Sequence, residues 1–192
     1  MSRVPDAHFE ARYQAGADPW RLEPRWYERR KRALTVAGLQ RERYRRAFEP
    51  GCALGLLTVI LARRCAEVIA VDASATAAVA AAQRTEGLPN VTVGRLSVPD
   101  EWPQGRFDLI LLSELGYYLD RPTMARLRDG AVARLTDDGE LLAVHYRPAV
   151  EEHILDGDQV HDILRAASGV RHVLHHVEEH FRMDAFMRNG MA

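Results

Sequence analysis

The stretch Glu49-Pro50-Gly51-Cys52-Ala53-Leu54-Gly55 decides the fold, because a loop with two glycines here joins a strand-like run to a helix-like one. Its spacing argues against two common nucleotide loops. The dinucleotide pattern G-x-G-x-x-G, started at Gly51, requires glycine where the chain has Ala53 and Leu56. The phosphate pattern G-x-x-x-x-G-K-[ST] fails as well, because Leu57, and not a lysine, stands directly before Thr58. What remains is a turn that lets the backbone approach a ligand without requiring phosphates.

On both sides of this loop, short apolar runs alternate with helical patterns. Ser74 can cap the start of an alanine-rich helix that Gly87 closes, Pro122 suits a first helical turn, and Asp138-Gly139 reads as a turn. The alternation predicts an α/β fold with an open, mostly parallel sheet, and the last two runs predict a hairpin at one edge. Strands are expected at residues 43–49, 67–72, 90–93, 106–114, 140–147, 170–177 and 180–188, and helices at 55–65, 74–87, 121–135 and 157–168.

Length and charge narrow the class of protein. A chain of 192 residues is expected to form one domain, and a net charge of -1 does not favour a nucleic-acid partner. The two cysteines, Cys52 and Cys65, are too few for a disulfide scaffold, which predicts a reduced, cytoplasmic setting. No long apolar segment or secretory leader is recognisable, so no membrane partner is expected.

Asp72 ends the strand that follows the glycine loop and is placed to accept hydrogen bonds from two ribose hydroxyls. In an open α/β sheet, ligands bind beyond the carboxyl ends of the strands, where both features lie. The loop and the acid together predict a site for a nucleoside that carries a non-phosphate tail. The alternatives are a tight structural turn at Gly51 and Gly55 and a helix-capping role for Asp72.

This combination resembles the class I S-adenosylmethionine-dependent methyltransferases, through residues 49–55, Asp72 and the run "RFDLILLSELGYYL". The segments "DPWRLEPRWYERRKRAL", "SELGYY" and "GDQVH" resemble, more narrowly, the nodulation protein S-type members. The resemblance implies a three-layer Rossmann-like fold: a seven-stranded, mostly parallel sheet with an antiparallel last strand and helices on both faces. It implies a single domain, residues 1–192, in which a helical cap or lid (residues 1–43) precedes the α/β core (residues 44–192).

The resemblance also implies the cofactor site. S-adenosylmethionine is expected to lie over the loop, with its ammonium oriented by Glu49 and by the backbone near Ser113, and its ribose held by Asp72. The other residues expected at the cofactor are Gly51, Cys52, Ala53, Gly55, Ala73, Ser97 and Val98, with Trp20 and Tyr27 as a lid. Ala53 stands where glycine is usual; because the loop runs into a helix, we expect a negative φ there.

The nodulation-type resemblance points to an amine acceptor, such as that of a deacylated amino sugar. An amine must be neutral to attack a methyl group, so a base is useful, and Glu114, His145 and His161 are the candidates. An O-methyltransferase and a catalytically inactive cofactor-binding partner remain alternatives. A nucleic-acid methyltransferase is disfavoured, since Ser113-Glu114-Leu115-Gly116 replaces the Asp/Asn-Pro-Pro-aromatic motif typical of base-amine methylation.

Two further patterns have a structural interpretation. The Arg-rich stretch 21–46 is expected to form the solvated face of an amphipathic helix, with a lid containing a basic residue as the alternative. His172, His175, His176 and His180 invite a metal interpretation, but strand neighbours point to opposite faces and no set of cysteines or carboxylates completes a site. We therefore expect surface histidines and no metal.

Overall fold

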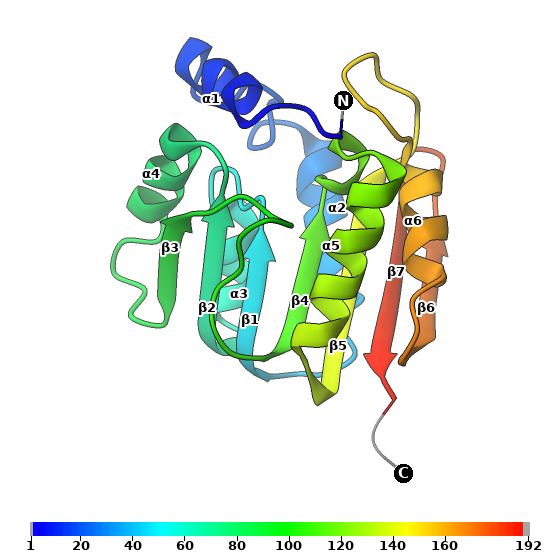
Figure 1. Cartoon of the computed structure of the whole chain (residues 1–192). Coiled ribbons are helices and arrows are strands. Elements are labelled where there is room, and N and C mark those ends of the chain that lie inside the picture. Colours follow the sequence, from blue (N-terminus) through cyan, green and yellow to red (C-terminus); the bar gives the residue numbers. More distant parts are fainter. Residues whose placement is uncertain (1, 190–192) are drawn as a thin grey trace.

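A seven-stranded sheet forms the centre of the computed structural model, which describes residues 2–189 (Figure 1). The strand order is β3-β2-β1-β4-β5-β7-β6, and β7 runs antiparallel to both of its neighbours. This confirms the predicted fold class, including the reversed last strand and the hairpin at one edge. The strands are β1 (Tyr44–Pro50), β2 (Cys65–Asp72), β3 (Val91–Arg95), β4 (Phe107–Ser113), β5 (Leu135–Tyr146), β6 (Val170–Val177) and β7 (Phe181–Arg188).

Helices cover both faces of the sheet. In Figure 1, α5 and α6 lie in front of the strands and α2 and α3 behind them, while α1 lies above the sheet near α4. None of the helices within residues 2–189 combines the length and apolar character needed to cross a membrane. The helices are α1 (Asp6–Ala15), α2 (Trp26–Ala37), α3 (Leu56–Ala62), α4 (Ala75–Arg84), α5 (Arg121–Arg134) and α6 (Gly157–Arg165), with a 3-10 turn, η1 (Gly116–Tyr118).

The apolar run of β4 is unbroken because both of its faces are buried. Ile110 and Leu112 pack on the side that includes Met124 of α5, whereas Leu109 and Leu111 pack on the side that includes Leu61 of α3. Successive side chains of a strand point to opposite faces, so a central parallel strand needs apolar residues at every position. This two-sided packing explains why β4 has the unbroken apolar run from which a covered strand was predicted.

Two expectations about local structure were wrong. Asp138-Gly139 does not separate a helix from a strand, because β5 begins at Leu135 and passes through it, with a shift in its register against β4. The Arg-rich stretch is not one helix either: α2 covers only its middle, and residues 44–46 belong to β1. The buried residues of α2 are polar, namely Glu28, Lys31 and Thr35, so the inner face of this helix has a role other than apolar packing.

Candidate functional site

A cavity of about 570 Å³ lies at the carboxyl ends of the parallel strands, between the sheet and the N-terminal helices. The switch point of the strand order lies between β1 and β4, where open α/β sheets bind ligands. The cavity brings together most of the residues expected at the cofactor: Trp20, Tyr27, Gly51, Ala53, Asp72, Ala73, Ser97, Val98 and Ser113. It also contains Glu114.

The glycine loop folds back onto β2 before α3 begins. The N–H groups of Gly51 and Cys52 both donate to the Val71 carbonyl, at 2.8 and 3.0 Å. This fold requires left-handed backbone at Gly51 (φ 73°), Ala53 (φ 51°) and Gly55 (φ 72°). The expected negative φ at Ala53 was wrong, because the chain turns at this residue and becomes helical only at Leu56.

Gly55 does not line the cavity. A Cβ placed on it would meet the Cα of Ala81 at 3.1 Å, so this glycine allows α3 and α4 to approach closely. Of the expected loop residues, only Gly51 and Ala53 lie on the main cavity. Cys52 and Glu49 line a smaller adjoining cavity, which also contains Lys31 and Glu114.

Asp72 at the end of β2 organises the loop as well as the cavity wall. Its Oδ2 accepts the Ala53 N–H at 3.0 Å and its Oδ1 accepts the Ser74 N–H at 2.9 Å. Burial raises the pKa of Asp72, and these two hydrogen bonds oppose that rise. Since a carboxylate oxygen can accept more than one hydrogen bond, both oxygens retain capacity for ligand hydroxyls. The N-cap of α4 is Ser74, whose hydroxyl accepts the Ala77 N–H, so the alternative of Asp72 as the helix-capping acid was wrong.

Glu49 is buried at the end of β1 and accepts a hydrogen bond of 2.7 Å from the Thr58 hydroxyl. Burial raises the pKa of Glu49 to about 7, with a further contribution from the negative charge of Asp72. A carboxyl group with this pKa responds strongly to a nearby cation, because ionisation costs little once an opposite charge approaches.

A cluster of one lysine and two glutamates lies at the other end of the cavity, with Lys31 and Glu28 buried and Glu114 partly exposed. The Lys31 ammonium is 3.0 Å from a Glu28 carboxylate oxygen and 3.1 Å from Glu114 Oε1. Burial opposes the charge on Lys31, but the two carboxylates outweigh it and leave its pKa raised. Glu114 Oε2 accepts the Tyr117 hydroxyl at 2.7 Å, and Glu114 itself has left-handed backbone (φ 57°). Lys31 is the only lysine of the chain, which was a signal that the sequence offered.

The Glu114 side chain lines the cavity and is 24% exposed. Its Oε1 is ion-paired with the Lys31 ammonium at 3.1 Å. The carboxylate therefore presents negative charge to the cavity, where it can attract a ligand that carries an ammonium group.

His145 and His161 do not reach the cavity, so the expectation that both join the acceptor site was wrong. Both are fully buried between β5, β7 and α6, and their rings are linked by a 3.2 Å contact from His145 Nδ1 to His161 Nε2. His145 Nε2 accepts the Gly116 N–H, and His161 Nδ1 bonds Asp184. Burial lowers the pKa of both histidines, so they are neutral supports beneath the turn that follows Glu114.

Two histidines line the cavity: His180, in the turn between β6 and β7, and His153, in the loop after β5. The His153 ring stacks on Tyr117 with 3.7 Å between ring centroids, and burial lowers the pKa of His153. Within the described residues its Nδ1 has no hydrogen-bond partner. Sequence reasoning missed His153 because it belongs to an irregular loop with no motif.

The N-terminal residues form the remaining wall of the cavity. Tyr13 of α1 and Trp20 pack edge to face, with ring centroids 5.3 Å apart, and both line the cavity. Glu10 of α1 accepts hydrogen bonds from the Ser74 and Thr76 hydroxyls at 2.7 and 2.6 Å, which attaches α1 to the start of α4.

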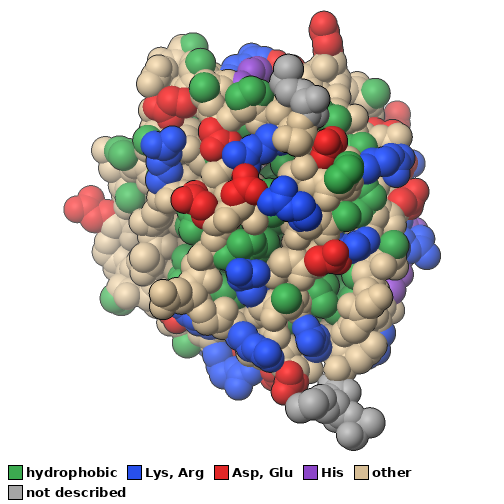
Figure 2. Space-filling view, viewed as in Figure 1, with side chains coloured by type: hydrophobic (Ala, Val, Ile, Leu, Met, Phe, Trp, Pro, Cys, Tyr) green, Lys and Arg blue, Asp and Glu red, His purple; other side chains and the backbone are tan. Residues whose placement is uncertain are grey.

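On the face that carries α5 and α6, acidic and basic side chains are interspersed, with apolar side chains between them (Figure 2). Such mixed charge differs from the continuous basic surface that binds nucleic-acid backbones.

Comparison with known proteins agrees with the resemblance to nodulation protein S-type methyltransferases. The family model of nodulation protein S matches residues 8–153. The nodulation protein S of Sinorhizobium fredii is 29% identical over 121 residues, which cover 62% of this chain and 56% of that protein. The Rhizobium tropici protein is 29% identical over 126 residues, 65% of this chain and 53% of that protein. The match thus spans little more than half the length of these relatives.

Solved structures show the same fold. A Pseudomonas syringae protein, assigned as a methyltransferase, is 46% identical with a TM-score of 0.77, and the match covers 85% of this chain and all of that one. The N-methyltransferase NodS of Bradyrhizobium japonicum, solved with S-adenosylhomocysteine, is 24% identical with a TM-score of 0.85, covering 96% of this chain and 99% of that one.

Proposed function

Because the chain belongs to the nodulation protein S family, we propose that it transfers a methyl group from S-adenosylmethionine to the nitrogen of a small amine acceptor. The observation that carries this proposal is the Glu114 carboxylate on the cavity wall, which is held by the Lys31 ammonium and the Tyr117 hydroxyl. A carboxylate in this position favours the approach of an amine in its ammonium form.

The residues present fit S-adenosylmethionine, which supplies a methyl group on a sulfonium when bound. Asp72 retains acceptor capacity on the cavity, and Gly51 keeps the cavity wall free of a side chain beside it. Glu49 lies on the adjoining smaller cavity and provides negative charge for an amino-acid ammonium. Ser97 and Val98 complete the cavity wall beyond Asp72, and we place the adenine of the cofactor against them.

The acceptor nitrogen must lose a proton before it can attack. In our proposal Glu114 orients the ammonium, and His153 takes the proton, since its lowered pKa keeps the ring neutral and its Nδ1 is free of other bonds. The ion pair with Lys31 holds the Glu114 carboxylate in place. Alignment of the acceptor nitrogen with the methyl group and exclusion of water then account for most of the rate enhancement.

We place the acceptor among amino sugars and amines of similar size, and the enzyme in the cytoplasm. The aromatic walls formed by Tyr117, Tyr118 and Tyr146 suit the apolar faces of a sugar ring. Both cysteines are free and buried, as befits a reducing compartment. Residues 2–43 act as a cap over the α/β core, and the mixed charge on the face that carries α5 and α6 argues against a nucleic-acid substrate there.

Methyl incorporation, read by mass, tests the proposal with a free amino sugar and its N-acetylated counterpart as acceptors. Glu114→Gln should lower turnover of the amine at least tenfold while changing the affinity for S-adenosylhomocysteine less than threefold. Glu28→Gln is the matched control, because it removes the other carboxylate from Lys31 and leaves Glu114 in place.

A loss of similar size in both variants would assign the effect to the pairing of Lys31 rather than to capture of the amine. Methylation of the acetylated sugar at the rate of the free amine would instead favour a hydroxyl acceptor and an O-methyltransferase.

A further inference from the structure

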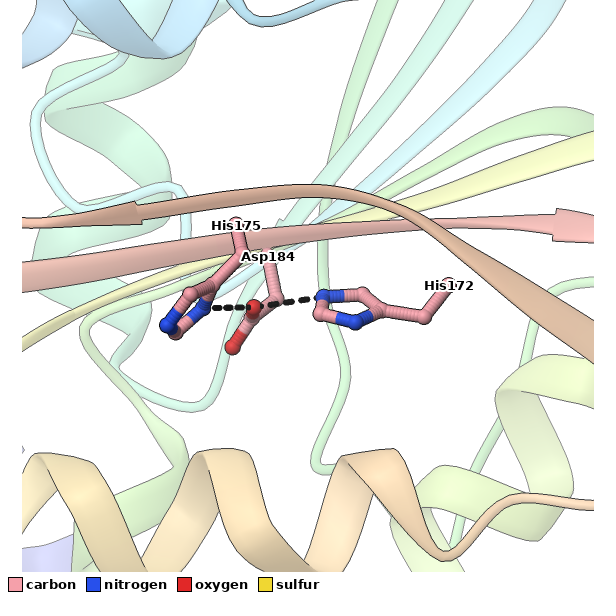
Figure 3. Close-up of side chains that lie close together, drawn as sticks. All are labelled: His172, His175 and Asp184. Carbon is pink, nitrogen blue, oxygen red and sulfur yellow. Dashed lines mark hydrogen bonds and ion pairs between the residues drawn. The ribbon is translucent and has the colours of Figure 1, made fainter.

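Three side chains converge on one point of the β6–β7 hairpin, far along the sheet from the cofactor cavity. His172 Nε2 and His175 Nδ1 lie 2.6 and 2.7 Å from the same oxygen of Asp184, Oδ1 (Figure 3). The three donor atoms lie within 4.8 Å of one another. None of the three residues lines the cavity.

The strand geometry explains why the histidines were expected to be separate and are not. In a regular strand, residues three apart point to opposite faces. Here the register of β6 against β7 shifts between His172 and Leu174, and this bulge returns His175 to the face of His172. Asp184, which was not considered as their partner, lies opposite His175 on β7.

The surroundings hold these groups in place as the outer partners of a metal site do. Asp184 is fully buried, and its second oxygen is bonded by His161 Nδ1 at 2.6 Å and by Arg182 Nε at 2.9 Å. The ring of His172 stacks on Phe186, with ring centroids 5.0 Å apart. His175 is about half exposed, which leaves a path from solvent. Ligating carboxylates are typically fixed by such further hydrogen bonds.

We propose that His172, His175 and Asp184 bind a divalent transition-metal ion of the zinc type. Two imidazole nitrogens and one carboxylate oxygen are a preferred ligand set for Zn²⁺, with water in the fourth position. Tetrahedral ligands about 2.1 Å from zinc are roughly 3.4 Å apart. The two N–O contacts must therefore open by less than about 1 Å, and the two imidazole nitrogens, which lie within 4.8 Å of each other, must come to the same separation. Both rings are partly exposed, which leaves them room to move.

The competing interpretation is that the cluster only joins β6 to β7 through hydrogen bonds. The two interpretations predict different effects when a histidine of the cluster is replaced by glutamine. His172→Gln and His175→Gln keep an N–H group that can donate to Asp184, but a neutral amide is a poor zinc ligand. His176 is the matched control, because it lies on the same strand and bonds Glu178 rather than Asp184.

The test is titration of the full, untagged chain with Zn²⁺ by calorimetry and with Co²⁺ by visible absorption, together with melting temperatures. We expect one equivalent of metal, Co²⁺ bands typical of tetrahedral coordination and a rise in melting temperature of about 5 °C at saturation. Each glutamine variant should weaken binding at least tenfold, and His176→Gln should bind as the unmodified protein does.

Absence of one-equivalent binding at 0.1 mM metal, roughly the upper range for a specific site, would overturn the proposal. So would unchanged binding in either His172→Gln or His175→Gln, or an equal loss in His176→Gln. Because metal binding is measured without substrate, these outcomes are independent of the proposed methyl transfer.

Discussion

Ala53 adopts a backbone conformation that a side chain disfavours. Left-handed backbone costs a non-glycine residue about 1–2 kcal/mol, whereas glycine costs about 0.5–1 kcal/mol in unfolded-state entropy. With φ at 51°, we expect Ala53→Gly to raise the free energy of unfolding by up to about 1 kcal/mol. Urea denaturation measures this change. Ala53→Val should be destabilising, and a glycine variant that is less stable would indicate a negative φ in solution.

Glu49 should make cofactor binding depend on pH. Its pKa of about 7 lies above that of an unfolded-chain glutamate, so the free protein loses stability as pH rises from about 4.5 toward 7, where the unfolded chain has already ionised. A ligand ammonium beside Glu49 favours the charged form and lowers its pKa. Affinity for S-adenosylhomocysteine should therefore rise between pH 6 and 8, with release of a proton.

Calorimetry in buffers of different ionisation enthalpy measures that proton. Glu49→Gln should abolish the release and flatten the pH dependence. Proton release that persists in this variant would assign it to another group.

Single residues could be predicted where a motif and a strand end coincide, and not where a partner is distant in the chain. Asp72 and Gly51 follow directly from the loop spacing. The contact of Lys31 with Glu114 joins a helix to a strand end, and no periodicity encodes it. His145 was misplaced for a related reason: it follows the expected strand order, but its side chain points beneath the turn rather than into the cavity.

Among the elements, α1 is attached to α4 by the hydrogen bonds of Glu10 and by apolar packing of Tyr13 in the cluster that contains Ala77. Hydrogen bonds from Thr76 and Ser74 lower the pKa of Glu10 to about 2, and a carboxylate at the start of a helix also suits the helix dipole. The attachment is therefore complete above about pH 4.5 and is lost as pH falls toward 2.

Glu10→Ala should release α1, which carries Tyr13 of the cavity wall, and should weaken binding of S-adenosylhomocysteine several-fold with a red shift of Trp20 emission. Stopped-flow fluorescence measures the faster dissociation. Gln14→Ala is the control, because Gln14 bonds Glu10 within α1 and not across to α4. Equal effects of both changes would mean that α1 is held by other contacts.

The strands could be predicted as elements because a strand that is buried on both faces, such as β4, has an unbroken apolar run. Turn residues mark the ends of that run. Irregularities within strands could not be predicted. The shift in β5 near Asp138 and the bulge in β6 near His172 depend on the neighbouring strand, which single-chain periodicity does not describe.

At the scale of the whole molecule, alternation of strands and helices predicted the order of layers, and the switch point between β1 and β4 predicted where the cavity lies. The depth of the cavity was not predictable. Its outer wall comes from residues 3–31, whose contacts reach residues as distant as Leu119 and Glu152.

That wall has a consequence for how the protein is made. Residues 3–37 leave the ribosome before any strand of the sheet, yet Arg3 pairs with Leu119, and Glu10 needs the start of α4. The contacts of this segment with the rest of the protein can therefore form only after β4 and the start of α4 have been synthesised. The sheet can be complete before the cavity is enclosed, because the cavity wall depends on contacts that close last in the order of synthesis.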